Sequence, residues 1–370
     1  MSKKDVVILH DTDGHPYFQA VELLHERGGI DSLVYLESSV FFLLVRHVLK
    51  KKLNLSSFKQ AFNNLLFRIK LPLVKNKTII MGMGPYDFRF FFYSLLAYRN
   101  DLIYQTSWPY WWSDNIPKKY SFFTPLCKRL IKYCLNNRRI KIVCVSNAAH
   151  STIIAGLSEE AIKRTYVIPH SVDVKMFSPR GNFLDWGKEN RVINILFVGR
   201  LVPSKGLPLI EKLAKFLPKD KYSFTIIGDG ELLEGLRKKY CSASGNVKVL
   251  GPIRNKLELA KFYKEADILL VPSVRTEKWE ELFGIVLIEG LSAGLVVMAS
   301  DHVGPREIID DTKNGYLFAD GSSFLSYANA IETLCKSESV FLSIKKNAVS
   351  YANLYSIDSV ADKWFELIRE

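Results

Sequence analysis

The chain has 370 residues, of which 48% are hydrophobic and 24% charged, a composition that excludes an intrinsically disordered protein. This length is too great for one ordinary hydrophobic core and predicts two domains. The net charge of +13 excludes an acidic protein and favours anionic partners such as a nucleic acid or a membrane surface. The five cysteines are scattered without a C-x-x-C pair, which predicts reduced thiols in a cytosolic protein and no zinc site.

The amino-terminal half contains a series of short apolar runs separated by polar segments. The first run is only five residues long, so the start of the chain does not have the form of a signal peptide. No apolar segment approaches the roughly 20 residues that span a bilayer. In chain order, the runs that predict strands are VVILH, LVYL, TIIMGM, LIYQT, IKIVCVS and YVIP.

Two stretches of this half, 38–86 and 115–158, contain no acidic residue but many lysines and arginines. In the first stretch, aromatic and aliphatic residues recur beside the lysines, as at Phe58, Phe62 and Leu66. This pattern predicts an amphipathic helix lying in the headgroup region of an anionic membrane. A solvated basic surface is the plainer alternative. A nucleic-acid partner is disfavoured, because neither stretch carries a recognisable DNA- or RNA-binding signature.

The carboxy-terminal half shows a clearer alternation of predicted strands and helices. The strands are NILFVGRL, SFTIIG, NVKVLG, DILLVPS and LVVMAS, and helical patterns of 8 to 12 residues separate them. Such alternation predicts βαβ units and a parallel sheet covered on both faces. The expected fold class is therefore α/β, with two doubly wound, Rossmann-like domains that face each other across a cleft. The boundary between them is expected in the polar stretch 178–191.

Ligands of open α/β sheets bind outside the carboxyl ends of the strands, so the residues that follow the strands are candidate ligands. Arg200 follows the strand NILFVG and Lys205 lies in the next turn, so the two cations are placed to bind one diphosphate. Further along, Phe283 and Gly284 open a helix. Its first amides, at Gly284, Ile285 and Val286, are expected to bind phosphate.

Two carboxylates flank this helix start, Glu281 in the loop before it and Glu289 inside it. A carboxylate accepts two hydrogen bonds at once, which suits the vicinal diol of a sugar. One glutamate can therefore bind a sugar ring and the other a ribose, with a diphosphate between them. The pattern predicts a nucleotide-sugar site.

The order of these segments resembles the retaining glycosyltransferases of the GT-B fold, in particular glycosyltransferase family 4, also described as glycosyl transferases group 1. The resemblance covers about 190–320, through G-R-x-x-x-x-K-G, IIGDGEL, V-x-x-L-G, ADILLVPS, E-x-F-G-I-V-L-I-E and NGYLF. It implies that Arg200 and Lys205 hold the donor diphosphate, that Glu281 contacts the donor sugar and that Glu289 contacts the ribose. The remaining donor-side residues that it implies are Gly199, Gly228, Phe283, Gly284, Ile285 and Val286, with Pro252 and Ile253 beside the base.

The resemblance also predicts the domain limits: 1–180 for an acceptor-binding domain, 191–350 for a nucleotide-sugar-binding domain, and 351–370 for a helix that returns to the first domain. The first domain matches poorly. Where similar enzymes carry a histidine after a strand, this chain has Thr106, Ser107 and Trp108. The acceptor-side candidates are Gly14, His15, Ser107 and Trp108.

The triplet Asp11-Thr12-Asp13 spells the D-x-D metal motif of a different glycosyltransferase fold, but it lacks the surrounding pattern. Because cations and helix amides already neutralise the diphosphate, we expect neither a metal nor another cofactor. The resemblance implies a retaining hexosyltransferase that moves a sugar from a UDP- or GDP-sugar to a glycan or lipid-linked acceptor. Its expected place is the cytoplasm, peripheral on the inner membrane face, in polysaccharide or glycolipid synthesis. The alternatives are a catalytically silent relative, an enzyme that alters the donor without an acceptor, and a basic nucleic-acid-binding protein.

Overall fold

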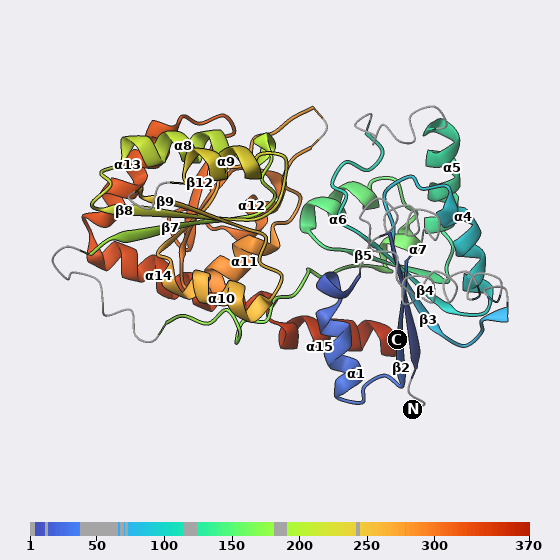
Figure 1. Cartoon of the computed structure of the whole chain (residues 1–370). Coiled ribbons are helices and arrows are strands. Elements are labelled where there is room, and N and C mark those ends of the chain that lie inside the picture. Colours follow the sequence, from blue (N-terminus) through green and yellow to red (C-terminus); the bar gives the residue numbers. More distant parts are fainter. Residues whose placement is uncertain are drawn as a thin grey trace. The chain divides into compact units, whose positions relative to one another are not determined.

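The structure is a computed structural model that describes residues 4–11, 14–37, 66, 70, 73–113, 124–180, 191–241, 245–277 and 279–370. The chain divides into two compact units (Figure 1). The N-terminal unit comprises residues 1–171 together with 360–370, and the C-terminal unit comprises residues 172–359. Within the described part of the chain, no helix combines the length and the hydropathy that crossing a bilayer requires.

The N-terminal unit is built on a six-stranded parallel sheet with the order β2-β1-β3-β4-β5-β6. The strands are β1 (Asp5–His10), β2 (Ser32–Glu37), β3 (Thr78–Gly82), β4 (Asp101–Thr106), β5 (Ile140–Cys144) and β6 (Thr165–Val167). All five residues of β3 are buried, as expected of a parallel strand with both faces covered. The strand order reverses between β1 and β3, so the crevice of this sheet is expected at their carboxyl ends.

The helices of this unit are η1 (His15–Tyr17), α1 (Gln19–Glu26), α4 (Arg89–Ser94), η3 (Leu95–Tyr98), α5 (Thr124–Leu135), α6 (Asn147–Ile154) and α7 (Glu159–Ile162). The last helix of the chain, α15 (Ile357–Arg369), contributes most of its length to this unit. Its Trp364 is buried and packs on Phe18 at the start of α1, with ring centroids 6.0 Å apart. The Lys141 ammonium of β5 donates to the Leu367 carbonyl oxygen at 2.8 Å.

The C-terminal unit holds a second six-stranded parallel sheet, with the order β12-β11-β10-β7-β8-β9. Its strands are β7 (Ile193–Val198), β8 (Tyr222–Ile227), β9 (Val247–Gly251), β10 (Ile268–Val271), β11 (Val296–Ser300) and β12 (Gly315–Phe318). The first strand of the unit, β7, lies beside the fourth, β10, which is the arrangement of a dinucleotide-binding fold. The crevice of this sheet is therefore expected between the ends of β7 and β10.

Helices cover both faces of the C-terminal sheet (Figure 1). One face carries α8 (Leu207–Phe216), α9 (Leu233–Lys239) and α13 (Phe324–Cys335), and the other carries α10 (Lys256–Glu265), α11 (Ile285–Ser292) and α14 (Glu338–Ala352). The shorter elements are η5 (Pro203–Lys205), α12 (Val303–Ile308) and η6 (Asn353–Tyr355). On α8, Leu207, Ile210 and Leu213 recur at helical spacing and join the core between this helix and the sheet.

The predicted α/β class with two parallel sheets is confirmed. Each predicted strand is present, and one strand was missed: β12, whose sequence GYLF is only four residues long and too short a run to indicate a strand by itself. The amphipathic helix predicted around Phe58 and Phe62 and the boundary stretch 181–190 lie outside the described residues, as do Thr12 and Asp13 of the D-x-D triplet.

Candidate functional site

At the crevice of the C-terminal sheet, the turn after β7 lies directly against the exit of β10. Gly206 closes this turn in a left-handed conformation with φ of +77°. A Cβ atom at this position would lie 1.8 Å from the carbonyl oxygen of Pro272, so only glycine lets the two segments approach. Val274 donates its backbone N–H to the Ser204 carbonyl at 2.8 Å. The turn that carries Lys205 is thus held on the strand end by backbone contacts.

Lys205 and Glu281 form an ion pair, and their side chains are only 14% and 13% exposed. The Lys205 ammonium also lies 4.6 Å from the centre of the Trp279 ring, and the Arg200 guanidinium lies 5.9 Å from it. The structure therefore brings Arg200 and Lys205, two of the residues predicted to be catalytic, to one indole, and the third, Glu281, to Lys205. Trp279 itself was missed, because nothing in the local pattern distinguishes it from a surface aromatic residue.

The loop that carries Glu281 is fixed through its backbone. The Glu281 N–H donates to His302 Nδ1 at 3.2 Å, and the Glu281 carbonyl accepts from the Gly304 N–H at 2.9 Å. Because Nδ1 accepts, the His302 Nε2–H donates to the Asp320 carboxylate, 3.1 Å away. The His302 side chain is fully buried, whereas Asp320 lies at the surface, so these hydrogen bonds link the Glu281 loop to a surface carboxylate. Sequence reasoning missed His302. It lies two residues after the end of β11, so the rule that ligand-binding residues follow strand ends could have found it.

The helix predicted after Phe283 is present and begins at Gly284. Gly284 is the N-cap of α11 with φ of +90°, and the buried Phe283 precedes it. The first N–H groups of a helix have no partner inside it, so the amides of Ile285 and Val286 can serve an anion. The ideal Cβ position of Gly284 lies 3.6 Å from the Glu281 side chain, so Glu281 stands beside this helix start.

Glu289 lies farther inside α11 and is 92% buried. Its Oε2 accepts a hydrogen bond of 2.7 Å from the Tyr263 hydroxyl of α10. Burial raises the pKa of Glu289 to about 7, although the hydrogen bond from Tyr263 and the charge of Lys256 act in the opposite direction. One oxygen of this carboxyl is thus already used inside the protein, which the sequence did not indicate. A ribose contact through Glu289 would have to use its other oxygen.

Four further predicted donor residues, Gly199, Gly228, Pro252 and Ile253, directly follow β7, β8 and β9. Gly228 donates its N–H to the Gly251 carbonyl at 3.0 Å, and a Cβ atom on Gly228 would lie 1.7 Å from the Gly199 carbonyl oxygen. The strand ends therefore approach closely at glycines. Pro252 is exposed and Ile253 half-buried directly after β9.

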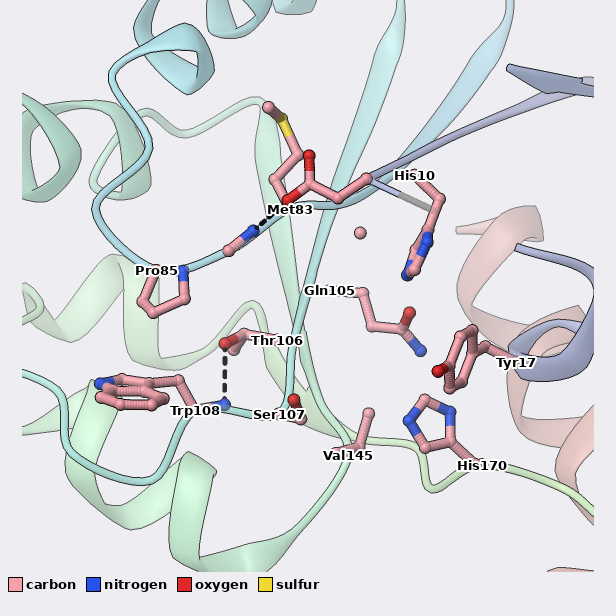
Figure 2. Close-up of a pocket in the computed structure, with 13 residues that line it drawn as sticks. His10, Tyr17, Met83, Pro85, Gln105, Thr106, Ser107, Trp108, Val145 and His170 are labelled. Carbon is pink, nitrogen blue, oxygen red and sulfur yellow. Dashed lines mark hydrogen bonds between the residues drawn. The ribbon is translucent and has the colours of Figure 1, made fainter. Parts of the chain in front are cut away.

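The N-terminal unit contains a pocket of about 280 Å³ at its own switch point (Figure 2). The pocket is lined by the residues that end or follow β1, β3, β4, β5 and β6, together with Tyr17. These residues are His10, Asp11, Tyr17, Gly82, Met83, Gly84, Pro85, Gln105, Thr106, Ser107, Trp108, Val145 and His170.

On one side of the pocket His10, Tyr17 and His170 are gathered, and Trp108 lies on the other (Figure 2). The Tyr17 ring lies 5.2 Å from His10 and 5.1 Å from His170, centroid to centroid. Burial lowers the pKa of His170 to about 4, so its imidazole is neutral at physiological pH. A Cβ atom on Gly82 would lie 2.2 Å from the His10 ring, so a glycine at the end of β3 makes room for that ring.

A fixed carboxylate forms another part of the pocket wall. Asp11 accepts from the Gly84 N–H at 2.9 Å and from Arg89 Nη2 at 3.0 Å. Arg89 is held in turn by the fully buried Asp87. The loop after β3 and the end of β1 are therefore tied together by charge-assisted hydrogen bonds.

Of the predicted acceptor-side residues, Ser107 and Trp108 line this pocket. Gly14 and His15 are not among its lining residues: His15 Nδ1 lies 2.6 Å from Glu22 Oε1, and its ring stacks on Tyr35 at 3.8 Å. Sequence reasoning missed His10, Asp11 and His170. The signal that could have found the first two is their position at the end of the strand next to the switch point.

Among the residues that the structure describes, no group of three or more His, Cys, Asp or Glu side chains is placed to hold a metal ion.

Known proteins resemble this chain in sequence and in fold. Residues 183–352 match the model of the family described as Glycosyl transferases group 1. HepE of Anabaena, solved in complex with UDP, superposes with a TM-score of 0.70 over 99% of each chain at 17% sequence identity. The fold is therefore the GT-B fold.

Curated relatives match parts of the chain. An uncharacterized 41.2 kDa protein in the cps region of Klebsiella pneumoniae is 37% identical over 127 residues, or 34% of this chain and 32% of that protein. The UDP-Gal:alpha-D-GlcNAc-diphosphoundecaprenol alpha-1,3-galactosyltransferase of Escherichia coli is 23% identical over 241 residues, or 62% of this chain and 60% of that enzyme. The matched regions thus span less than two thirds of these relatives.

Proposed function

We propose that the protein is a retaining glycosyltransferase of family 4 that transfers a hexose from a nucleotide-sugar donor. The observation that carries the proposal is the Lys205–Glu281 ion pair beside the glycine start of α11. It combines a cation for phosphate, a carboxylate for sugar hydroxyls and free helix amides at one strand-end crevice. The family match over residues 183–352 supports this reading.

In the proposed reaction the leaving group is a nucleoside diphosphate. Lys205, Arg200 and the amides of Ile285 and Val286 stabilise the negative charge that develops on it, which lowers the barrier. Lys205 has three N–H donors, so it can bind a phosphate oxygen and still contact Glu281. The acceptor hydroxyl attacks from the side of the leaving group, a phosphate oxygen takes its proton, and the anomeric configuration is retained. No metal or other cofactor takes part in this scheme.

The donor proposed is a UDP- or GDP-sugar, and the acceptor a glycan or lipid-linked sugar bound in the N-terminal pocket. The UDP bound by HepE and the lipid-diphosphate acceptor in the name of the E. coli relative support these classes. In the pocket, Ser107 and Asp11 offer polar contacts and Trp108 an aromatic face for a sugar ring. The proposed setting is polysaccharide or glycolipid synthesis at the cytoplasmic face of the inner membrane.

A thermal-shift series with UDP, GDP and their sugars tests the donor site. A ligand at 100 times its Kd stabilises the folded state by about 2.7 kcal/mol. For a domain of this size that corresponds to a shift of roughly 5–10 °C. We expect one nucleotide to give this shift and the other to give much less. No shift with either nucleotide at millimolar concentration would argue against the assignment.

The residue roles are tested by the variants Lys205→Ala and Glu281→Gln, with Lys212→Ala on the exposed side of α8 as the matched control. Removing one charge-stabilising group costs about 10²–10³ in kcat. We expect losses of this size in both site variants and near wild-type turnover in the control. If both purified site variants keep normal turnover, the donor site lies elsewhere.

A catalytically silent relative is the second candidate, because the position after β4 holds Thr106, Ser107 and Trp108 in place of the histidine that the family resemblance predicts. Incubation of the donor alone and with cell-envelope acceptors separates the cases. A silent protein binds the nucleotide without turnover, and an enzyme that alters the donor needs no acceptor.

A further inference from the structure

The helical stretch formed by α4 and η3 presents two apolar faces. Its inner face contributes the buried Phe90, Tyr93 and Leu96 to the core of the N-terminal unit. Its outer face carries four large apolar side chains at spacings of four, three and three residues. These are Phe88, Phe92, Leu95 and Tyr98, with exposed fractions of 54%, 62%, 52% and 67%. A row of this kind on one helical face is not the scattered exposure found on ordinary surfaces.

Helix α5 packs against α4 (Figure 1) and has exposed apolar side chains of its own. Its outer face carries Leu126 and Tyr133, which are 56% and 73% exposed, with Arg129 between them at helical spacing. We call the six exposed apolar side chains of the two helices the α4–α5 apolar surface. It consists of Phe88, Phe92, Leu95, Tyr98, Leu126 and Tyr133.

Cations accompany this surface, and an exposed acid, Asp101, follows Tyr98 by three residues. The segments 88–100 and 124–139 contain no aspartate or glutamate. Exposed cations occur in both: Arg99, Arg129, Lys132, Arg138 and Arg139. Arg139 lies directly beside the apolar row, because its guanidinium is 5.7 Å from the Tyr98 ring and donates to the Tyr98 carbonyl at 2.8 Å. Aromatic side chains interleaved with arginines suit the boundary between acyl chains and anionic headgroups.

We propose that the α4–α5 apolar surface docks the N-terminal unit on a bilayer that contains anionic phospholipid. Phe88, Phe92 and Leu95 enter the headgroup and acyl boundary, and the surrounding arginines and lysines contact the lipid phosphates. The choice of a lipid surface over a protein partner rests on charge: a predominantly cationic rim matches a uniformly anionic surface.

Along the chain, the segment that lines the pocket leads directly into the docking surface. Gly82, Met83, Gly84 and Pro85 line the pocket, and Phe88 begins the apolar row three residues later. A lipid-linked acceptor whose lipid stays in the bilayer would therefore present its sugar near the pocket of the same unit. This inference deepens the membrane part of the proposed function and does not depend on sugar transfer.

The test is co-flotation of the full-length protein with vesicles of phosphatidylcholine alone or with 30% phosphatidylglycerol, a composition of about one anionic lipid in three. The apolar variant is Phe92→Ser/Leu95→Ser, and its matched control is Leu257→Ser/Leu354→Ser on exposed positions of the C-terminal unit. The charge variant is Arg129→Glu/Arg138→Glu, and its matched control is Lys212→Glu/Lys215→Glu on α8. Thermal unfolding verifies that each variant is folded, and the nucleotide thermal shift is measured in parallel.

We expect the wild type and both controls to float with anionic vesicles and not with neutral ones. The apolar and charge variants should each lose at least 10-fold in the vesicle partition coefficient while keeping the nucleotide shift. The inference is overturned if the wild type does not float. It is equally overturned if the apolar variant floats like the wild type, or if the wild type is a dimer that this variant converts to monomer. A lost nucleotide shift in the wild type with intact flotation removes the proposed donor site and leaves the docking surface standing.

Discussion

Glu289 and Lys205 are two charged side chains of the predicted donor site that have different surroundings in the C-terminal unit. Lys205 keeps its charge compensated by Glu281 at the edge of the crevice. Glu289 lies inside, hydrogen-bonded to a tyrosine, and its pKa is raised to about 7 by burial. The two glutamates therefore differ. Glu281 is ion-paired with Lys205, whereas Glu289 is buried and hydrogen-bonded to Tyr263 of the same unit.

The burial of Glu289 predicts how the free energy of unfolding depends on pH. The folded state keeps the Glu289 proton up to about pH 7, whereas the unfolded chain releases it near its ordinary pKa of 4.5. The folded-state penalty is therefore absent below pH 4.5, grows as the pH rises through this window and is complete above 7. Glu289→Gln, which cannot ionise, should be more stable than the wild type at pH 8 by roughly 1–3 kcal/mol.

The measurement is the melting temperature of both proteins between pH 4.5 and 8. The variant should gain several degrees over the wild type at the alkaline end, and the two should converge at the acidic end. Glu258→Gln, on the exposed first turn of α10, is the control and should show no such window. A difference between Glu289→Gln and the wild type that does not vary with pH would contradict the buried-carboxyl assignment.

At the scale of elements, the turn between β7 and α8 owes its position to a single glycine. Gly206 and Gly321 have the same φ of +77°, so alanine meets the same backbone strain of about 1–3 kcal/mol at either position. They differ in surroundings: the Cβ atom would lie 1.8 Å from the Pro272 oxygen at Gly206 and would meet nothing within 4 Å at Gly321.

Gly206→Ala should therefore lower the melting temperature at least twice as much as Gly321→Ala. It should also weaken the nucleotide thermal shift, because the clash with Pro272 displaces the turn that carries Lys205. Gly321→Ala introduces the backbone strain without the clash, so it should leave the nucleotide thermal shift unchanged. Equal effects of the two substitutions on stability and on nucleotide binding would show that the close approach of the two segments is unimportant.

The sheets could be predicted from the sequence because their strands are buried runs such as ILLV in β10, whose character is local. The strand-end rule also pointed to Arg200 and Lys205. The packing of Lys205 on Trp279 could not be predicted, because the two are 74 positions apart and only the fold brings them together. The same holds for the contact of Tyr17 with His170, and for the Tyr263 hydroxyl that occupies one oxygen of Glu289.

At the scale of the whole molecule, the net charge of +13 allows a nucleic-acid-binding protein as a rival interpretation. Charge alone gives only non-specific binding, typically with Kd of 10⁻⁴–10⁻⁶ M at physiological salt. We expect a 20-base-pair duplex to bind in this weak range at 150 mM salt and to dissociate as salt rises. Fluorescence anisotropy measures this, with a scrambled duplex as the control. Nanomolar affinity that distinguishes the two duplexes at 150 mM salt would make nucleic acid the primary partner.

The return of α15 to the N-terminal unit has a consequence for how the chain is made. Trp364 packs on Phe18, and Phe365 packs near Gly29, so these contacts form only after residues 360–370 have been synthesised. The C-terminal unit, residues 172–359, is synthesised before them. The unit whose sheet is synthesised first is thus the unit that finishes folding last, and its hydrophobic interior is incompletely covered until α15 is available.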